Sequence, residues 1–155
     1  MIPVHSIGLT EVLTEAADRG IRVVLFHGTV YGLSAEKVFA AFGTSLTEQG
    51  RECARIIAEY VGGGDKNILE LQTENGSSVL KDRTTGFRNQ VREYPGLEIA
   101  NVIRGGTTRM EAFQAVVDYL SNTEKKIDGI FAHNDEAGMG ALAALESLGD
   151  RKSVV

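Results

Sequence analysis

Arg83 is the residue whose type and position most directly suggest contact with a ligand. Val79, Phe87 and Val91 recur at spacings of four on one face of an expected helix, and Arg83 falls on the same face. A charged side chain on an inward face needs partners, and a guanidinium offers a planar fork of donors to a ligand. A structural salt bridge, for example to Glu70, is the alternative that spacing alone leaves open.

Two polar residues, Asn134 and Asp135, stand where a strand is expected to give way to a helix. Both residue types are common helix N-caps, so capping alone would explain them. The functional interpretation is that one residue caps the helix while the other presents its amide or carboxylate to a ligand. This turn lies beyond the carboxyl end of a strand, where open parallel sheets bind their ligands.

The other reactive residue types form no catalytic or metal-binding pattern. The histidines His5, His27 and His133 are far apart and lack metal-ligand spacing, although His27 and His133 both end expected strands and could line one cleft. The single cysteine, Cys53, falls inside an expected helix and is interpreted as a small buried hydrophobe. We therefore predict no catalysis, no metal and no cofactor.

Residues 138–143 match the pattern G-x-G-x-x-A of dinucleotide-binding proteins. That fingerprint requires its glycines in the turn before a helix. Here Asn134 and Asp135 already begin the helix, so the glycines fall inside it. Close packing of the helix on the sheet is the simpler interpretation.

The elements that would hold these residues alternate along the chain. Helical periodicity predicts helices, and short apolar runs predict strands. The expected helices span 8–19, 45–61, 77–94, 107–121 and 135–148, and the expected strands 22–26, 38–42, 67–71, 97–102 and 127–132, with another strand opening at the C-terminal end. This alternation predicts an α/β fold with a mainly parallel sheet flanked by helices on both faces.

Composition narrows the possible functions. The chain has 155 residues, a formal net charge of -5 and a pI of about 5.2. A nucleic-acid binder normally carries a basic surplus, so we predict no nucleic-acid partner. Apolar runs are far shorter than the roughly 20 residues of a membrane-spanning helix. The amino end lacks the basic and apolar regions of a signal peptide.

Several motifs together resemble the sugar-binding proteins of bacterial ABC importers. They are residues 68–72 (ILELQ), 76–78 (GSS), 82–87 (DRTTGF), 94–99 (YPGLEI) and, most specifically, 129–136 (GIFAHNDE) followed by 140–142 (GAL). The last stretch is similar to the ribose and galactofuranose binders of the type I periplasmic fold. The resemblance covers the chain from about Ser6 to its end.

The resemblance implies two α/β lobes that hold a monosaccharide between them by hydrogen bonds to its hydroxyls. Residues 1–44 would be a partial first lobe ending at a hinge. Residues 45–155 would be most of a second, flavodoxin-like lobe, so the chain would be a truncated form. The resemblance also implies a membrane permease as partner and a periplasmic or extracellular location for the parent protein.

Carried over residue by residue, the resemblance makes Arg83 and Asn134 sugar ligands and Asp135 the helix cap. Family members often carry Asp-Arg at the turn where this sequence has His27, and a stacking aromatic where it has Thr107. The expected ligand-binding set is therefore Arg83, Asn134, Asp135, His27 and Thr107. The two departures at His27 and Thr107 leave the identity of the sugar open.

Three alternatives remain. The effector-binding core of a LacI-type sugar-responsive regulator has the same fold and would need a helix-turn-helix segment. The second alternative is a stand-alone flavodoxin-like enzyme or signalling domain. A phospho-receiver domain would need clustered acidic residues at strand ends, whereas the expected strand at 22–26 is followed by histidine and glycine. The third alternative is a fragment without function that forms homo-oligomers through strand edges left unpaired by missing strands.

Overall fold

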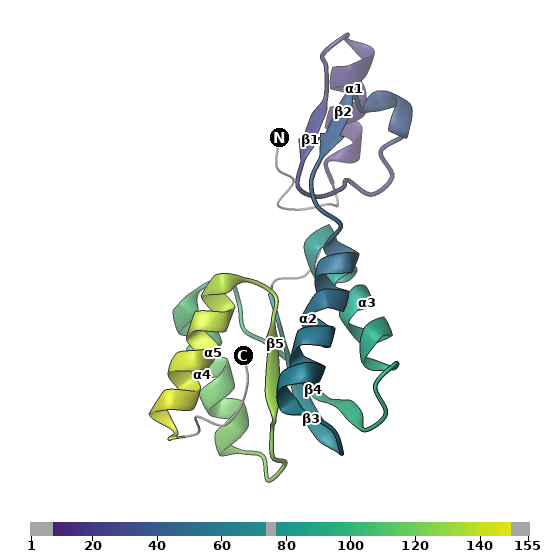
Figure 1. The fold of residues 1–155 in the computed structure, drawn as a ribbon. Coiled ribbons are helices and arrows are strands. Elements are labelled where there is room, and N and C mark those ends of the chain that lie inside the picture. The colour runs from purple at the N-terminus through teal and green to yellow at the C-terminus, as the bar shows by residue number, and fades with distance from the viewer. Residues whose placement is uncertain (1–7, 74–76, 150–155) are drawn as a thin grey trace.

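The computed structural model describes residues 8–73 and 77–149 of the chain (Figure 1). The strand expected at the C-terminal end and His5 lie outside these residues. Within the described ranges, no helix is long and apolar enough to cross a membrane. The described strands form two separate parallel sheets, and each sheet has its own hydrophobic core.

The N-terminal part, residues 8–42, is a two-stranded sheet with a helix on one face. Its elements are α1 (Thr10–Asp18), β1 (Val24–Phe26), a 3-10 helix (Ala35–Lys37) and β2 (Ala40–Phe42). Buried Val23 and Leu25 pack against the apolar face of α1. Phe26 and Phe42 are register partners on the opposite face and remain exposed. The sequence predicted these elements except the 3-10 helix.

The C-terminal part, residues 46–149, places a sheet between two layers of helices. Its elements are α2 (Leu46–Val61), β3 (Lys66–Gln72), α3 (Ser78–Val91), β4 (Leu97–Arg104), α4 (Arg109–Ser121), β5 (Gly129–Ala132) and α5 (Asp135–Ser147). The strand order is β4-β3-β5, and both pairings are parallel. These elements confirm the predicted α/β fold with a parallel sheet flanked by helices.

The central strand β3 divides the core into two layers, because its side chains alternate between the two faces of the sheet. Leu69 and Leu71 pack with residues of α4 and α5. Ile68 packs on the other face with residues of α2 and α3, including Phe87. Glu70 lies on the same face as Ile68 and is the one charged residue of β3 that is fully buried.

Glycines let the helices on each face approach closely. A Cβ atom at Gly86 of α3 would lie 1.8 Å from the backbone oxygen of Thr47 in α2. A Cβ atom at Gly140 of α5 would lie 2.4 Å from the backbone oxygen of Arg109 in α4. Gly140 therefore lies inside a helix as predicted, but its own close contact is with α4, whereas Ala141 and Ala144 of the same helix pack on the sheet.

Residues 43–45 join β2 to α2 and connect the two parts (Figure 1). Two contacts also link the parts near the start of α3. The backbone N–H of Thr29 donates to Ser78 Oγ at 3.2 Å, and Lys81 Nζ lies 4.8 Å from the ring centroid of Tyr31. The division into lobes at 1–44 and 45–155 stays a prediction.

Candidate functional site

A pocket of about 930 Å³ runs along the outer edge of β5, between α2 and α5. In the part of the chain that the structure describes, β5 pairs with β3 on one side only, so its other edge is open to the pocket. Most of the pocket lining is apolar. The apolar side chains include Ile56, Ile57, Ile130, Met139 and Leu142.

Polar groups gather where β5 ends. Arg83, Asn134 and Asp135 all line the pocket there, together with Gln49 from the first turn of α2. The structure thus brings together three of the five side chains expected to contact a ligand. We call this region the polar end of the pocket.

Arg83 is held in place by three hydrogen bonds. Its Nε and Nη2 donate to Gln49 Oε1 at 3.0 and 2.8 Å, and its Nη1 donates to the backbone oxygen of His133. A guanidinium has five N–H donors, so two remain for a ligand. The alternative salt bridge to Glu70 is not formed, because Glu70 pairs instead with Arg88, at 2.9 Å between Oε2 and Nε.

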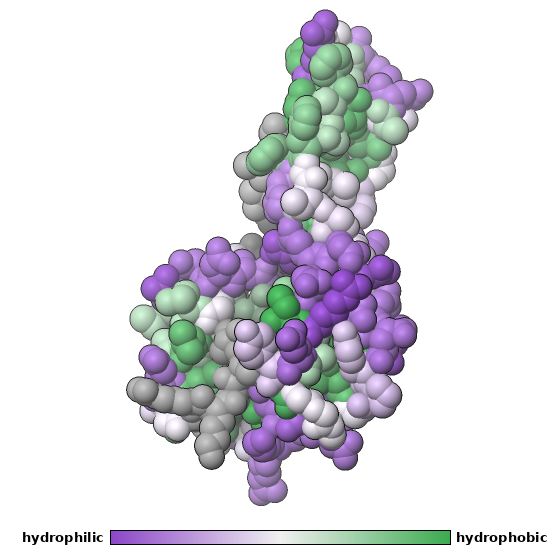
Figure 2. All heavy atoms as spheres, in the orientation of Figure 1, coloured by the Kyte–Doolittle hydropathy of each residue, from purple (hydrophilic) through white to green (hydrophobic). Residues whose placement is uncertain are grey.

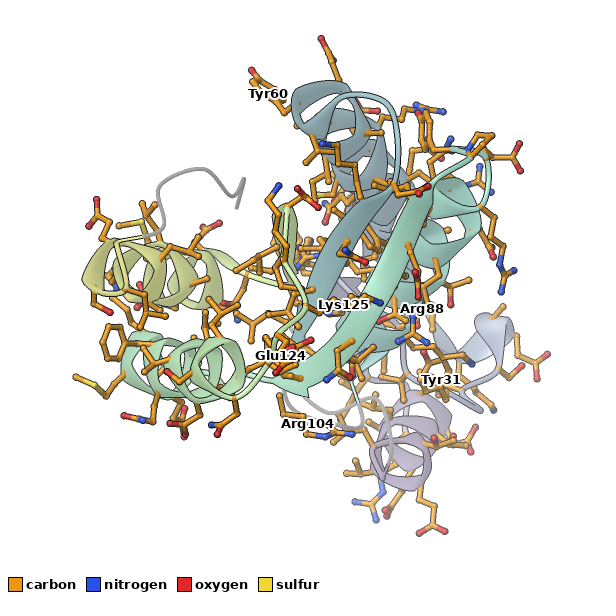
Figure 3. The ribbon with its side chains drawn as sticks, turned by 90° about the horizontal axis from the view of Figure 1, so that it is seen from below. Tyr31, Tyr60, Arg88, Arg104, Glu124 and Lys125 are labelled. Atoms are coloured by element: carbon orange, nitrogen blue, oxygen red, sulfur yellow. The ribbon has the colours of Figure 1, made fainter. Side chains whose placement is uncertain are left out.

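A buried carboxylate lies beneath the polar end of the pocket. Glu70 Oε1 accepts hydrogen bonds from Gln72 Nε2 at 2.9 Å, Thr84 Oγ1 at 2.7 Å and His133 Nε2 at 3.1 Å, while Oε2 accepts from Arg88, labelled in Figure 3. Burial alone would raise the pKa of Glu70, but these four donors outweigh it and lower the pKa to about 2. Glu70 is therefore ionised at neutral pH.

His133 joins the buried carboxylate to the polar end of the pocket. Its Nε2 must donate to Glu70, because an ionised carboxylate can only accept. Its backbone oxygen accepts from Arg83, so one residue contacts both groups. His133 lines the pocket, as expected for a residue that follows a strand. Its Nδ1 is buried, with no hydrogen-bond partner among the residues described.

Asn134 builds the turn that follows β5. Its backbone is extended, with φ -153° and ψ 172°, and its side-chain oxygen accepts from the Ala137 N–H at 2.8 Å. Asn134 is thus the N-cap of α5. The assignment of the cap to Asp135 is wrong, because Asp135 is the first residue of the helix. The amide nitrogen of Asn134 takes no part in the cap.

His27 and Thr107 lie outside the pocket lining. His27 follows β1 with φ 54°, and its backbone N–H donates to the Phe42 oxygen at 2.7 Å. Thr107 precedes α4, and its backbone N–H donates to Glu111 Oε2 at 3.1 Å. Their roles as sugar ligands stay predictions.

Cys53 lies on the α2 side of the pocket and is half-buried. Burial raises the pKa of its thiol, which is the opposite of an activated nucleophile. Over residues 8–73 and 77–149, no group of three or more His, Cys, Asp or Glu side chains could hold a metal ion.

Comparison with known proteins decides the family. Residues 1–155 match the family model of the periplasmic binding protein domain. The chain belongs to this family. Among the relatives of this periplasmic binding protein domain is the galactofuranose-binding protein of Escherichia coli (strain K12). It is 28% identical over 149 residues, which cover 95% of this chain and 47% of the relative.

Solved structures agree with this assignment. A Mycobacterium smegmatis protein in complex with β-D-fucofuranose matches the domain with a TM-score of 0.89 and 30% identity, covering 99% of this chain and 51% of that chain. The periplasmic binding protein component of the arabinose ABC transporter of Shewanella sp. ANA-3 was solved bound to α- and β-L-arabinofuranose. It matches with a TM-score of 0.87 and 26% identity, covering 96% of this chain and 50% of that chain. The chain thus spans about half the length of these proteins. The predicted resemblance to periplasmic sugar-binding proteins is confirmed.

Proposed function

We propose that this chain supplies about half of the substrate-binding component of an ABC sugar importer, and that it contacts a monosaccharide. The observation that carries this proposal is the meeting of Arg83, Asn134 and Asp135 at the polar end of one pocket. It is supported by relatives that are named for galactofuranose or were solved with arabinofuranose. These comparisons favour an importer component over the regulator considered from the sequence.

The polar end of the pocket suits sugar hydroxyls, which both donate and accept hydrogen bonds. The two remaining N–H donors of Arg83 would meet hydroxyl oxygens. The carboxylate of Asp135 would accept from hydroxyls, and the amide nitrogen of Asn134 would donate to one. Once a bound sugar covers such groups they discriminate strongly, because a missing hydroxyl leaves one of them unpaired. We assign the sugar to this end, because polar side chains gather there, whereas most side chains along the rest of the pocket are apolar.

The whole protein would act by binding and release, without catalysis and without a cofactor. In it, His27 and Thr107 are proposed as additional sugar contacts. The partner would be a membrane permease that receives the sugar, and the location would be periplasmic or extracellular. No nucleic-acid partner is proposed, given the formal net charge of -5.

Two single substitutions test whether Arg83 contacts the sugar. Arg83→Met removes the guanidinium at the polar end of the pocket, whereas Arg92→Met removes one at the carboxyl end of the same helix, outside the pocket lining. We expect the first variant to bind ribose, arabinose or galactose at least about tenfold more weakly than the unaltered chain. The second should bind the same sugar unchanged.

A second variant addresses Asn134 without disturbing the helix it caps. Asn134→Ala would remove both the amide and the cap, so we choose Asn134→Ser, which keeps a capping oxygen. Sugar binding should weaken while the melting temperature stays near that of the unaltered chain. The site assignment is wrong if both Arg83→Met and Asn134→Ser bind sugar as the unaltered chain does.

A further inference from the structure

Gln49 contacts the proposed sugar-binding arginine in an unusual way. Its single side-chain oxygen accepts from both Nε and Nη2 of Arg83, at 3.0 and 2.8 Å. In the described ranges no carboxylate forms a salt bridge with Arg83. The neutral amide of Gln49 therefore holds this edge of the guanidinium. Among the described residues, no acidic side chain pairs directly with the positive charge of Arg83.

The orientation of the Gln49 amide follows from chemistry. A guanidinium can only donate hydrogen bonds, so the oxygen of the amide must face Arg83. The nitrogen then points the other way and donates to Thr44 Oγ1. Thr44 lies in the segment that joins β2 to α2, so its hydroxyl fixes the far side of the amide.

The backbones of α2 and α3 hold the two side chains at this distance. A Cβ atom at Gly50, the residue after Gln49, would lie 2.1 Å from the backbone oxygen of Arg83. The helices therefore touch beside this pair. Because the backbones cannot come closer and the amide is fixed at both ends, the guanidinium has one favoured orientation.

We infer that Gln49 is a positioning residue for the ligand-binding arginine. It orients Arg83 so that the two remaining N–H donors face the ligand before the ligand arrives. Fixing a side chain in its bound conformation removes an entropic cost of binding. The inference rests on the proposed sugar-binding function, and it assigns Gln49 no contact with sugar.

The binding test uses Gln49→Met, which keeps the length of the side chain and removes the amide. Affinity for the sugar should fall about tenfold, equivalent to the loss of roughly 1.4 kcal/mol. Gln49→Glu should restore most of the affinity, because a carboxylate also accepts two bonds from a guanidinium. The matched control is Gln114→Met, on the exposed face of α4 and outside the pocket lining, which should bind normally.

A double-mutant cycle separates positioning from direct contact or general damage. If Gln49 acts through Arg83, then Gln49→Met should cause no further loss of affinity in a chain that already carries Arg83→Met. An additional tenfold loss in that background would overturn the inference, because it would show that Gln49 affects binding independently.

A measurement without sugar distinguishes failure of this inference from failure of the proposed function. The Arg83 Nε–H resonance should exchange slowly with water in the unaltered chain and faster in Gln49→Met. An unchanged resonance in Gln49→Met would overturn the positioning role whatever the sugar results. Faster exchange in a chain that binds no sugar would support the hold of Gln49 on Arg83 and overturn the sugar-binding function.

Discussion

Glu70 carries a negative charge although its side chain is 0% exposed. Four donors surround it, and one of them, His133, also holds Arg83 through its backbone oxygen. The geometry of the polar end of the pocket therefore depends on a charge placed beneath it. Removing one partner of a buried charged pair is costly, because the other partner is left without compensation.

This charge predicts how stability depends on pH. The pKa of Glu70 is about 2 in the folded chain, below its ordinary 4.5. Its contribution, about 3 kcal/mol, is thus fully present above about pH 5 and is lost as the pH falls towards 2. Glu70→Gln should lower the free energy of unfolding by about 3 kcal/mol at pH 7 and flatten the pH dependence below pH 5.

Urea unfolding at pH 7 and pH 3 measures both effects. The control is Glu98→Gln, because Glu98 forms an exposed pair with Lys125 at 3.5 Å, and such a pair contributes little. A Glu70→Gln variant as stable as the unaltered chain at pH 7 would show that the buried charge of Glu70 does not stabilise the fold.

The sequence predicted some of these residues and missed others for physical reasons. Arg83 stood out because a charge interrupted an apolar helical stripe, and the turn at Asn134 stood out because it follows a strand. Gln49 gave no signal, since helical spacing reveals which face a residue occupies and says nothing of a partner on another helix. Glu70 was considered only as a partner of Arg83, whereas it pairs with Arg88, about one turn further along α3.

At the scale of elements, local signals fix where the helices begin. Ser45, Ser77 and Thr108 each accept a hydrogen bond from a backbone N–H three residues later, and Thr108 forms a full capping box with Glu111. Because these signals are local, the helices could be predicted to within a few residues. The strand order and the close contact of α2 with α3 depend on distant residues and were not predicted.

The contact between α2 and α3 yields a prediction about Gly86. Alanine there would place a Cβ atom 1.8 Å from the Thr47 backbone oxygen, so the helices must separate. Overpacking of this kind costs about 1–3 kcal/mol, and the shift would also pull Gln49 away from Arg83. Gly86→Ala should lower the free energy of unfolding by about that amount and weaken sugar binding.

Thermal or urea unfolding compares this variant with Gly63→Ala. Gly63 follows α2, and among the described residues a Cβ atom there would meet nothing within 4 Å. Gly63→Ala should therefore leave stability unchanged or raise it slightly. Equal stabilities for the two variants would show that close helix contact does not constrain position 86.

At the scale of the whole molecule, two apolar surfaces are open among the described residues. One is the pocket along β5. The other is on the N-terminal part, where Figure 2 shows hydrophobic side chains gathered over β1 and β2. There Phe26 and Phe42 are 53% and 60% exposed. We propose that the chain forms homo-oligomers through its unpaired strand edges, and the exposed apolar surface on the N-terminal part favours this association.

Sedimentation velocity should show that the chain forms oligomers at micromolar concentrations. Phe42→Thr should weaken association about tenfold or more, because a buried phenylalanine contributes about 1.5–3 kcal/mol. Tyr60→Gln changes another exposed aromatic residue, on α2 (labelled in Figure 3), and should leave association unchanged. A monomeric chain at all concentrations would contradict this proposal.

An NMR titration of the chain shows whether the polar end of the pocket contacts a sugar. D-ribose, L-arabinose and D-galactose would each be added up to millimolar concentrations while the Arg83 Nε–H and Asn134 amide resonances are followed. At least one sugar should shift both resonances in a saturable way and leave the Arg92 resonance unmoved. Unchanged Arg83 and Asn134 resonances with every sugar, in a chain that melts cooperatively, would contradict the proposed sugar contact.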